Sequence, residues 1–334
     1  MSSLSGSNGD SKMTELSTLS QQTLAQGLFR IGFQAMGTPC EITYQCDSTK
    51  DATEFQERSL AWVRRFEKRY SRYLPDSLIS SINKAAGSGQ AISIDEEDDR
   101  LFKLCDTLHF FTHGLFDPTT LPLAQIWDFK AKNPKIPEDF KIQNALAKIG
   151  WKRVIRENLS VSLPDAGMGL DFGGFGKEYA VDQVVELARA FGISNLLVNF
   201  GGDLRTLGSP PDSPHWRVGL EDPNQPGKAK YAVRANNLAV ATSGNYLRFF
   251  EVDGKRYGHL LDHRTGYPTS NNHLAATVIS HSCLEAGILA TCSLIDERMK
   301  GLSLIENHFA SEGCVWTKSG LCWSKRFDLH LLTD

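Results

Sequence analysis

The densest group of residues suited to chemistry is a glycine-rich run at positions 168–177, MGLDFGGFGK, which leads directly into a helical stretch. Backbone amides of such a loop, the positive end of the following helix and the ammonium of Lys177 could together hold a phosphate. The run matches neither of the two common phosphate motifs, GxxxxGK[ST] and GxGxxG. Two interpretations therefore stay open, a phosphate-binding loop and a tight connection between two elements.

A second polar group lies at positions 241–266, where Thr242, Ser243 and Gly244 precede a histidine and a carboxylate. Imidazole titrates near neutral pH, so His259 could act as a general base that Asp262, three residues later, orients. The alternative is a surface turn in which Asp262 caps the chain and His259 is solvated.

Three shorter segments have the composition of turns. In residues 199–203, NFGGD, the two glycines suit positive φ and Asp203 could bond to the local backbone. Residues 33–38 could line a pocket or fill the core, and residues 114–119 contain the Asp-Pro pair that is common in turns.

The elements that must position these residues are helices and strands without the regular alternation of a doubly wound sheet. Apolar residues recur at helical spacing in residues 52–73, 95–112, 178–191 and 284–295. Alternating or continuous apolar segments predict strands at residues 30–45, 196–200, 232–242 and 256–261. The sequence has no short-period repeat, which argues against a solenoid.

Composition describes an ordinary globular protein, with either one large domain or two coupled halves. The chain has 334 residues, 41% of them hydrophobic and 22% charged, and its 36 basic and 39 acidic residues give a formal net charge of −3. A chain of this length can bury a sizeable core without disulfides or a structural metal. The near-neutral balance has no basic stripe, so we expect no nucleic-acid partner.

The N-terminal residues 1–26 are rich in Ser, Gly, Thr and Gln and predict a disordered tail, followed by a single domain over residues 27–334. No segment has the apolar length of a signal peptide or of a membrane span, about 20 residues, so we expect a cytoplasmic protein with no membrane span. Seven cysteines without a CxxC pair favour reduced, buried thiols over a disulfide framework or a zinc site.

Taken in chain order, these segments resemble the ApbE family of FAD:protein FMN transferases, from about Arg30 to Ile295. Seven boxes match in the right order, which makes a chance resemblance improbable. The boxes are Phe33 to Thr38; Ser71, Tyr73, Ser77 and Asn83; Phe116 to Trp127; Asp171 through Lys177 to Asp182; Asn199 to Asp203; Thr242, Ser243, Gly244 and Tyr246; and His259, Asp262, Thr265 and Gly266.

The resemblance implies an α+β fold, T-fold-like, in which mainly antiparallel sheets and packed helices surround a flavin cleft. It also implies a metal-dependent enzyme that cleaves FAD, attaches FMN through a phosphoester to a Thr or Ser of a target flavoprotein, and releases AMP. FAD would be the substrate, a divalent metal, usually Mg²⁺, the cofactor, and the target flavoprotein the partner.

The resemblance further assigns roles to single residues. His259 and Asp262 are the expected catalytic pair. The residues expected to bind FAD are Met36, Tyr73, Leu115, Phe116, Asp117, Asp171, Lys177, Thr242, Ser243, Gly244 and Leu261. The positions expected to hold the metal are Gly174, Gly287, Ala290 and Thr291.

Three positions depart from the family pattern. Gly287 stands where the family has a metal-binding Asp, Glu178 where a Gly usually follows the Lys, and His263 where a Pro usually follows the Asp. The changes leave three hypotheses: an active FMN transferase, an FAD-binding protein that has lost transfer, and an FAD pyrophosphatase. Under the first, Gly287→Asp is expected to raise metal-dependent activity.

Overall fold

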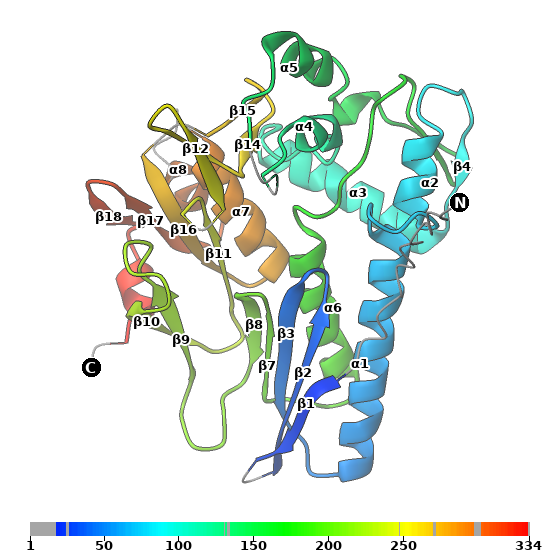
Figure 1. The fold of residues 1–334 in the computed structure, drawn as a ribbon. Coiled ribbons are helices and arrows are strands. Elements are labelled where there is room, and N and C mark those ends of the chain that lie inside the picture. The colour runs from blue at the N-terminus through cyan, green and yellow to red at the C-terminus, as the bar shows by residue number, and fades with distance from the viewer. Residues whose placement is uncertain are drawn as a thin grey trace, which may run out of the picture.

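The molecule is organised around a nine-stranded antiparallel sheet (Figure 1). The computed structural model describes residues 18–24, 27–129, 131, 134–246, 248–269, 272–296 and 302–332. In spatial order the strands of the sheet are β1 (Thr18–Thr23), β2 (Leu28–Ala35), β3 (Thr38–Gln45), β7 (Leu196–Phe200), β8 (Asp203–Leu207), β11 (Ala239–Gly244), β16 (His273–Ser280), β17 (Glu312–Thr317) and β18 (Gly320–Trp323).

Short strands form four smaller antiparallel sheets around the large one. They are β4 (Ile92–Ser93), β5 (Ile155–Glu157) and β6 (Ser160–Ser162); β9 (Trp216–Glu221) and β10 (Ala229–Ala235); β12 (Phe249–Val252) and β13 (Lys255–Gly258); and β14 (Leu261–Asp262) and β15 (Tyr267–Pro268).

Helices cover one side of the large sheet and one end of the molecule (Figure 1). They are α1 (Thr49–Tyr70), α2 (Leu78–Lys84), α3 (Glu96–Phe111), α4 (Leu121–Ile126), α5 (Asp139–Leu146), α6 (Gly176–Ala190), α7 (Cys283–Ile295) and α8 (Leu302–Glu306), with 3₁₀ turns η2 (Trp151–Arg153) and η3 (Phe327–His330).

The two faces of the sheet belong to different hydrophobic cores, because side chains alternate along each strand. In β11, Ala239 and Ala241 face the large core under α1, α6 and α7, whereas Val240 faces a smaller core. The smaller core lies under the β9–β10 hairpin and η3, where Trp216 and Phe327 are buried. Burial on both faces explains why β11 begins with three consecutive apolar residues, Ala239, Val240 and Ala241.

A third core supports the segment that contains His259 and Asp262. Trp127, at the end of α4, is buried among residues of α5 and of the β12–β13 hairpin. Its indole Nε1 donates to the carbonyl of Gly266, at 2.9 Å. Gly266 has φ +80°, and a Cβ there would lie 2.3 Å from the side chain of Ile142, so this turn requires glycine.

The structure confirms the predicted α+β class with mainly antiparallel strands, and the four predicted helices correspond to α1, α3, α6 and α7. Three predicted strands are wrong in one respect, because each spans parts of two strands. Residues 256–261 run from β13 through two residues outside any strand to the first residue of β14. Residues 30–45 are divided by a two-residue turn at Met36 and Gly37, whose φ angles of 50° and 72° suit a tight hairpin. Residues 232–242 are divided between β10 and β11, which belong to different sheets.

The predicted disordered tail needs a correction at its C-terminal end. Strand β1 lies within the predicted tail and pairs with β2 at the edge of the sheet. The sequence of β1 shows little alternation of polar and apolar residues, so it does not predict a strand. Pairing with β2 makes this segment a strand. Residues 1–17, 25 and 26 lie outside the described residues. The large sheet takes strands from both ends of the chain, which supports the proposal that residues 27–334 form one domain.

Within the described residues, no helix has the length and apolar character needed to cross a membrane. All seven cysteines are free thiols, and five of them are buried. Burial raises the pKa of Cys40, Cys292 and Cys314 to about 12. The five buried thiols agree with the prediction of buried cysteines, whereas Cys46 is half-buried and Cys322 is exposed.

Candidate active site

The glycine-rich run forms the loop that enters α6. Phe175, the N-cap residue of α6, makes no side-chain cap hydrogen bond, so the first amides of the helix are not satisfied by a capping side chain. Gly174 is exposed, and a Cβ built on it would meet nothing within 4 Å. An uncapped helix N-terminus behind an open loop is suited to an anion.

Asp171 anchors the beginning of this loop. One carboxylate oxygen accepts from the amide of Gly173 at 2.9 Å, and the other lies 2.7 Å from Nε of Arg72. The guanidinium of Arg72 in turn lies over the ring of Tyr73, 4.2 Å from its centroid. Tyr73 is 72% exposed, so the face of its ring opposite Arg72 is available to a planar ligand.

Lys177 joins three motifs that are far apart in the sequence. Its ammonium forms ion pairs with Asp203, at the beginning of β8, and with Glu178, at 3.3 Å. The other carboxylate oxygen of Asp203 accepts from the amide of Thr242, at 3.1 Å. The glycine-rich loop, the 199–203 turn and the end of β11 therefore form one site.

Two hydroxyl groups meet where β11 packs against α7, since that of Ser243 lies 2.6 Å from that of Thr291. The hydroxyl of Thr242 lies 2.9 Å from that of Thr277 on the opposite face of the sheet, the face of the smaller core. Gly244 follows Ser243 directly, and a Cβ there would lie 2.6 Å from the ring of Tyr246. The end of β11 therefore places a hydroxyl oxygen that could bind a metal or phosphate next to a glycine, where the backbone has no side chain.

The space above Gly287 is filled by Glu178. A Cβ built on Gly287 would lie 2.6 Å from Cγ of Glu178 and 3.1 Å from its Oε1. The Glu178 side chain is 12% exposed, and its Oε2 is buried with no hydrogen-bond partner among the described residues. Gly287, expected at the metal site, thus offers no side chain, but a carboxylate from α6 occupies its space.

Asp182 holds α6 and α7 in register. Its carboxylate accepts from the amides of Cys283 and Leu284, each at 2.9 Å, and from the hydroxyl of Ser282 at 2.8 Å. It therefore caps the N-terminus of α7 from a neighbouring helix and also pairs with Arg205 at 2.9 Å.

His259 lies at the end of β13, beside Arg248. Its Nδ1 lies 3.3 Å from the carbonyl oxygen of Arg248, whose guanidinium is also close. Burial, and then the charge of Arg248, lower the pKa of His259 below its usual range. The imidazole is therefore neutral near pH 7, the form that a general base requires.

The expected pairing of Asp262 with His259 is not formed in this structure. The carboxylate of Asp262 instead accepts from Nε and Nη2 of Arg264, at 2.9 and 2.8 Å. Arg264 is only two residues from Asp262, in the same turn, so its guanidinium reaches the carboxylate directly. His259 instead contacts the carbonyl oxygen of Arg248. Burial lowers the pKa of His263, which interacts with Asp117 and Asp262.

The remaining residues expected to bind FAD differ in exposure. The half-buried Met36 donates its amide to Glu67 at 2.9 Å, and Leu261 is half-buried beside the third core. Leu115 and Phe116 belong to the large core, and Asp117 is buried where it accepts from the amide of Trp151 at 3.0 Å. These three side chains are buried, so they support the wall of the site and do not line its open side.

Four charged residues of the site were not expected from the sequence to bind FAD or metal or to take part in catalysis. Arg72 lies next to Tyr73, and Arg264 lies between Asp262 and Thr265, so each adjoins a matched box position. Asp203 and Glu178 were singled out, the first as a turn residue and the second as a departure. The ion pairs that Asp203 and Glu178 form with Lys177 could not be predicted from the local sequence.

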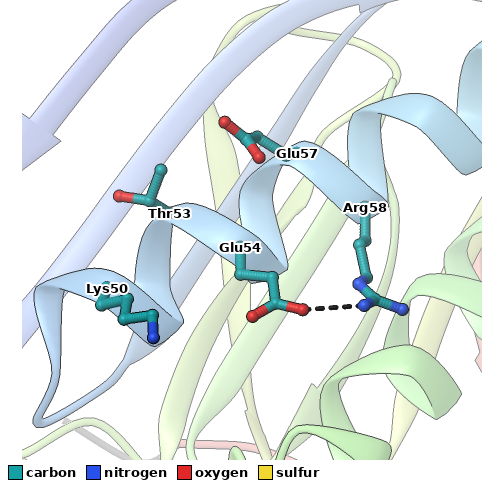
Figure 2. Close-up of a pocket in the computed structure, with 5 residues that line it drawn as sticks. All are labelled: Lys50, Thr53, Glu54, Glu57 and Arg58. Carbon is teal, nitrogen blue, oxygen red and sulfur yellow. Dashed lines mark hydrogen bonds and ion pairs between the residues drawn. The ribbon is translucent and has the colours of Figure 1, made fainter.

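A pocket on the outer face of α1 is separate from this site. Figure 2 shows its lining side chains, all from one helix, with Glu54 and Arg58 joined by an ion pair at 2.8 Å. Pairs at this spacing are typical of a solvated helix face, and we assign the pocket no function. Across the described residues, no three His, Cys, Asp or Glu side chains form a metal cluster.

Comparison with known proteins gives one consistent relationship. Residues 36–315 match the model of the ApbE family. The FAD:protein FMN transferase of Vibrio cholerae serotype O1 is 28% identical over 275 residues, which cover 81% of this chain and 82% of that protein. The protein of the same name from Klebsiella pneumoniae is 30% identical over 260 residues, covering 77% and 78%.

A solved structure agrees with the sequence match. The crystal structure of the ApbE protein from Thermotoga maritima superimposes with a TM-score of 0.82 at 28% identity, covering 92% of this chain and all of that one.

Proposed function

The chain belongs to the ApbE family, and from this premise we infer that it is an FAD:protein FMN transferase. FAD is the substrate, and FMN is transferred to a target flavoprotein. We further propose that the acceptor group is a Thr or Ser hydroxyl, that AMP is released and that a divalent metal takes part.

One observation supports this function best. Lys177, the uncapped N-terminus of α6 and the oxygen donors of Ser243 and Thr291 meet at one place. A pyrophosphate needs amide donors and positive charge, and a divalent cation bound to it needs oxygen ligands. Lys177 and Ser243 belong to the matched boxes, and Thr291 is one of the positions expected to hold the metal.

We propose that the flavin half of FAD lies toward Tyr73 and Met36, and its phosphates lie at the α6 N-terminus. Tyr73 would stack on the flavin, because its ring is exposed and Arg72 holds it in place. Asp171 would position Arg72 and the loop, while Lys177 would balance the phosphate charge. Leu115, Phe116 and Asp117 would support this wall from the core.

In the proposed reaction the oxygen of the acceptor hydroxyl attacks the phosphorus of the FMN half. A new P–O bond forms, the bond from that phosphorus to the bridging oxygen breaks, and AMP leaves with that oxygen. The hydroxyl proton passes to His259, which is neutral because burial lowers its pKa. Asp262, fixed by Arg264, would position the 259–266 segment rather than the imidazole itself.

The metal site that we propose uses the hydroxyl of Thr291 and the carbonyl oxygens of Ala290 and Gly174. Oxygen donors of this kind suit Mg²⁺, which keeps part of its water shell and binds substrate phosphates. When bound, such an ion would neutralise charge that develops on the leaving phosphate.

The test is a reaction of the purified protein with FAD, Mg²⁺ and an acceptor flavoprotein domain that carries a candidate Thr or Ser. AMP is measured by chromatography, and covalent flavin by in-gel fluorescence of the acceptor. We expect both products in equal amounts, and neither after Mg²⁺ is chelated. The matched control replaces the acceptor Thr or Ser by Ala.

Two other outcomes would contradict this proposal. AMP and free FMN without covalent flavin would indicate an FAD pyrophosphatase, in which water takes the place of the acceptor hydroxyl. Bound FAD without AMP under any metal condition would indicate a flavin-binding protein that has lost transfer.

A further inference from the structure

A carboxylate of α6 lies beside the position where the family pattern places one on α7. Gly287 removes it from α7, and Glu178 introduces one at a position where the pattern has glycine. In the structure the two departures meet, since Cγ of Glu178 lies 2.6 Å from where a Cβ of residue 287 would be. The two positions compete for this space, because a side chain at 287 would collide with Glu178.

The contact follows from the register of the two helices. Asp182 caps the N-terminus of α7 at Cys283 and Leu284. Glu178 precedes Asp182 by four residues and Gly287 follows Cys283 by four, about one helical turn in each case. The helices are therefore antiparallel at this contact, and the Asp182 cap keeps Glu178 over Gly287.

One oxygen of the Glu178 carboxylate lacks a partner among the described residues. Its Oε2 is buried without a hydrogen-bond partner among the described residues, and its Oε1 has Lys177 at 3.3 Å, an ammonium that Asp203 also engages. Leaving a buried carboxylate oxygen unpaired is costly, because the group loses water and gains no partner. Such an atom is expected where a ligand completes the site.

The neighbouring donors match a hard divalent ion. Thr291 follows Gly287 by four residues, so it lies on the same face of α7, and its hydroxyl is 2.6 Å from that of Ser243. Glu178 is in the first turn of α6, whose uncapped N-terminus we assign to the phosphates. A carboxylate here would lie between the hydroxyl donors and the substrate phosphates.

We propose that Glu178 is the carboxylate ligand of the divalent metal, replacing the aspartate that Gly287 eliminates. The inference rests on the proposed function, since the metal is the one that function uses. It makes Gly287 and Glu178 a compensating pair: glycine at 287 leaves room for a longer side chain that reaches the same space from the opposite helix.

The direct test measures metal binding rather than turnover. Mn²⁺ serves as the probe, because its free concentration can be followed by electron paramagnetic resonance in the presence of FAD. We expect Glu178→Gln, which keeps the size and removes the charge, to weaken Mn²⁺ binding by at least about tenfold. The matched control is Glu186→Gln, two turns further along α6 on an exposed side chain, for which we expect no change.

A second variant moves the carboxylate back to α7. Glu178→Gly combined with Gly287→Asp should recover Mn²⁺ affinity to within a few-fold of the unmodified protein. Glu178→Gly alone should remain weak. Circular dichroism and thermal melting confirm that each variant is folded before its affinity is compared.

Two results would overturn the inference. One is unchanged Mn²⁺ affinity in folded Glu178→Gln, and the other is a double variant no better than Glu178→Gly. Failure of the proposed function has a different signature, because the unmodified protein would then form no covalent flavin on the acceptor while its Mn²⁺ affinity could still be compared with that of the variants.

Discussion

At the scale of single residues, the properties of the site depend on which partner neutralises each charged side chain. Lys177 is shared by Glu178 and Asp203, whereas Asp262 takes its charge partner from Arg264, two residues away. The Nδ1 of His259 lies against the backbone carbonyl of Arg248, and no carboxylate of the described residues bonds to it. The histidine is therefore available as a base, and its protonation is governed by burial and by Arg248.

Replacing His259 should separate catalysis from binding. We expect His259→Gln to lower kcat for flavin transfer by about 10²- to 10⁴-fold, the usual contribution of a general base. FAD affinity, measured by quenching of flavin fluorescence, should change little. An equal loss in the affinity for FAD would instead assign the residue to substrate binding.

The pH dependence of transfer follows from the pKa of His259. Burial lowers that pKa below the ordinary value of 6.5, so the imidazole stays neutral as the pH falls through 6.5 and is protonated only at lower pH. The acid limb of the kcat profile should therefore lie below about pH 6.5. Arg248→Met removes a neighbouring positive charge and should move this limb to higher pH. A limb at or above pH 6.5 in the unmodified enzyme would contradict the assignment.

Gly287→Asp by itself should now destabilise the protein rather than activate it, contrary to the expectation from sequence. The new Cβ would lie 2.6 Å from Cγ of Glu178, and a second carboxylate would enter the same space. Overpacking of this kind costs about 1–3 kcal/mol. The free energy of unfolding, measured with urea, should recover when Glu178→Gly is added, and strictly additive effects would show that the two residues do not interact.

At the scale of elements, the site depends on the antiparallel packing of α6 and α7 against the large sheet. The structure shows the two helices side by side, next to β8 and β11 (Figure 1). Helix α6 provides its N-terminus and α7 provides Thr291, so a shift of one helix along the other would separate the two halves of the site. The Asp182 cap resists that shift.

Asp182→Asn should therefore affect both stability and metal binding. Loss of the charged acceptor weakens the bonds to Ser282, Cys283 and Leu284 and removes the ion pair of Arg205. We expect the free energy of unfolding to fall by about 1.5–3 kcal/mol, the range for a hydrogen bond to a charged group. Glu186→Gln, one turn further along α6, is the matched control. Unchanged Mn²⁺ affinity in a folded Asp182→Asn protein would show that the register does not depend on this cap.

At the scale of the whole molecule, two cores on opposite faces of one sheet support a site near the end of β11. The helical side contains the site residues of α6 and α7, while the β9–β10 side forms a separate core. The third core, around Trp127, holds the 259–266 segment against the rest of the molecule. A ligand that contacts both the α6–α7 region and the 259–266 segment should therefore stabilise the whole fold.

Combined addition of FAD and Mg²⁺ should raise the Tm of the unmodified protein. A ligand that binds only the folded state stabilises it by about 2.7 kcal/mol at one hundred times its Kd. Differential scanning fluorimetry should show that chelation reverses the metal-dependent part of the increase. In Glu178→Gln the metal-dependent increase in Tm should be small, whereas the increase in Tm caused by FAD alone should remain. A full metal-dependent increase in this variant would contradict the role of Glu178.

The sequence by itself determined the family, the α+β class and the main helices. Ordered boxes such as Asp171 to Lys177 and amphipathic spacing are local, so they can be recognised without knowing what lies across the fold. The division of residues 30–45 at Met36 was missed because a two-residue hairpin turn interrupts the alternation only briefly.

Only the tertiary structure decided how the departures from the family pattern act together. Glu178 and Gly287 are distant in sequence, and their meeting depends on the cap that Asp182 places on α7. The partner of Asp262 was likewise settled by side-chain geometry, which favoured Arg264 over His259. Side chains from distant elements compete for space and charge after the chain has folded, and spacing along the sequence does not encode that competition.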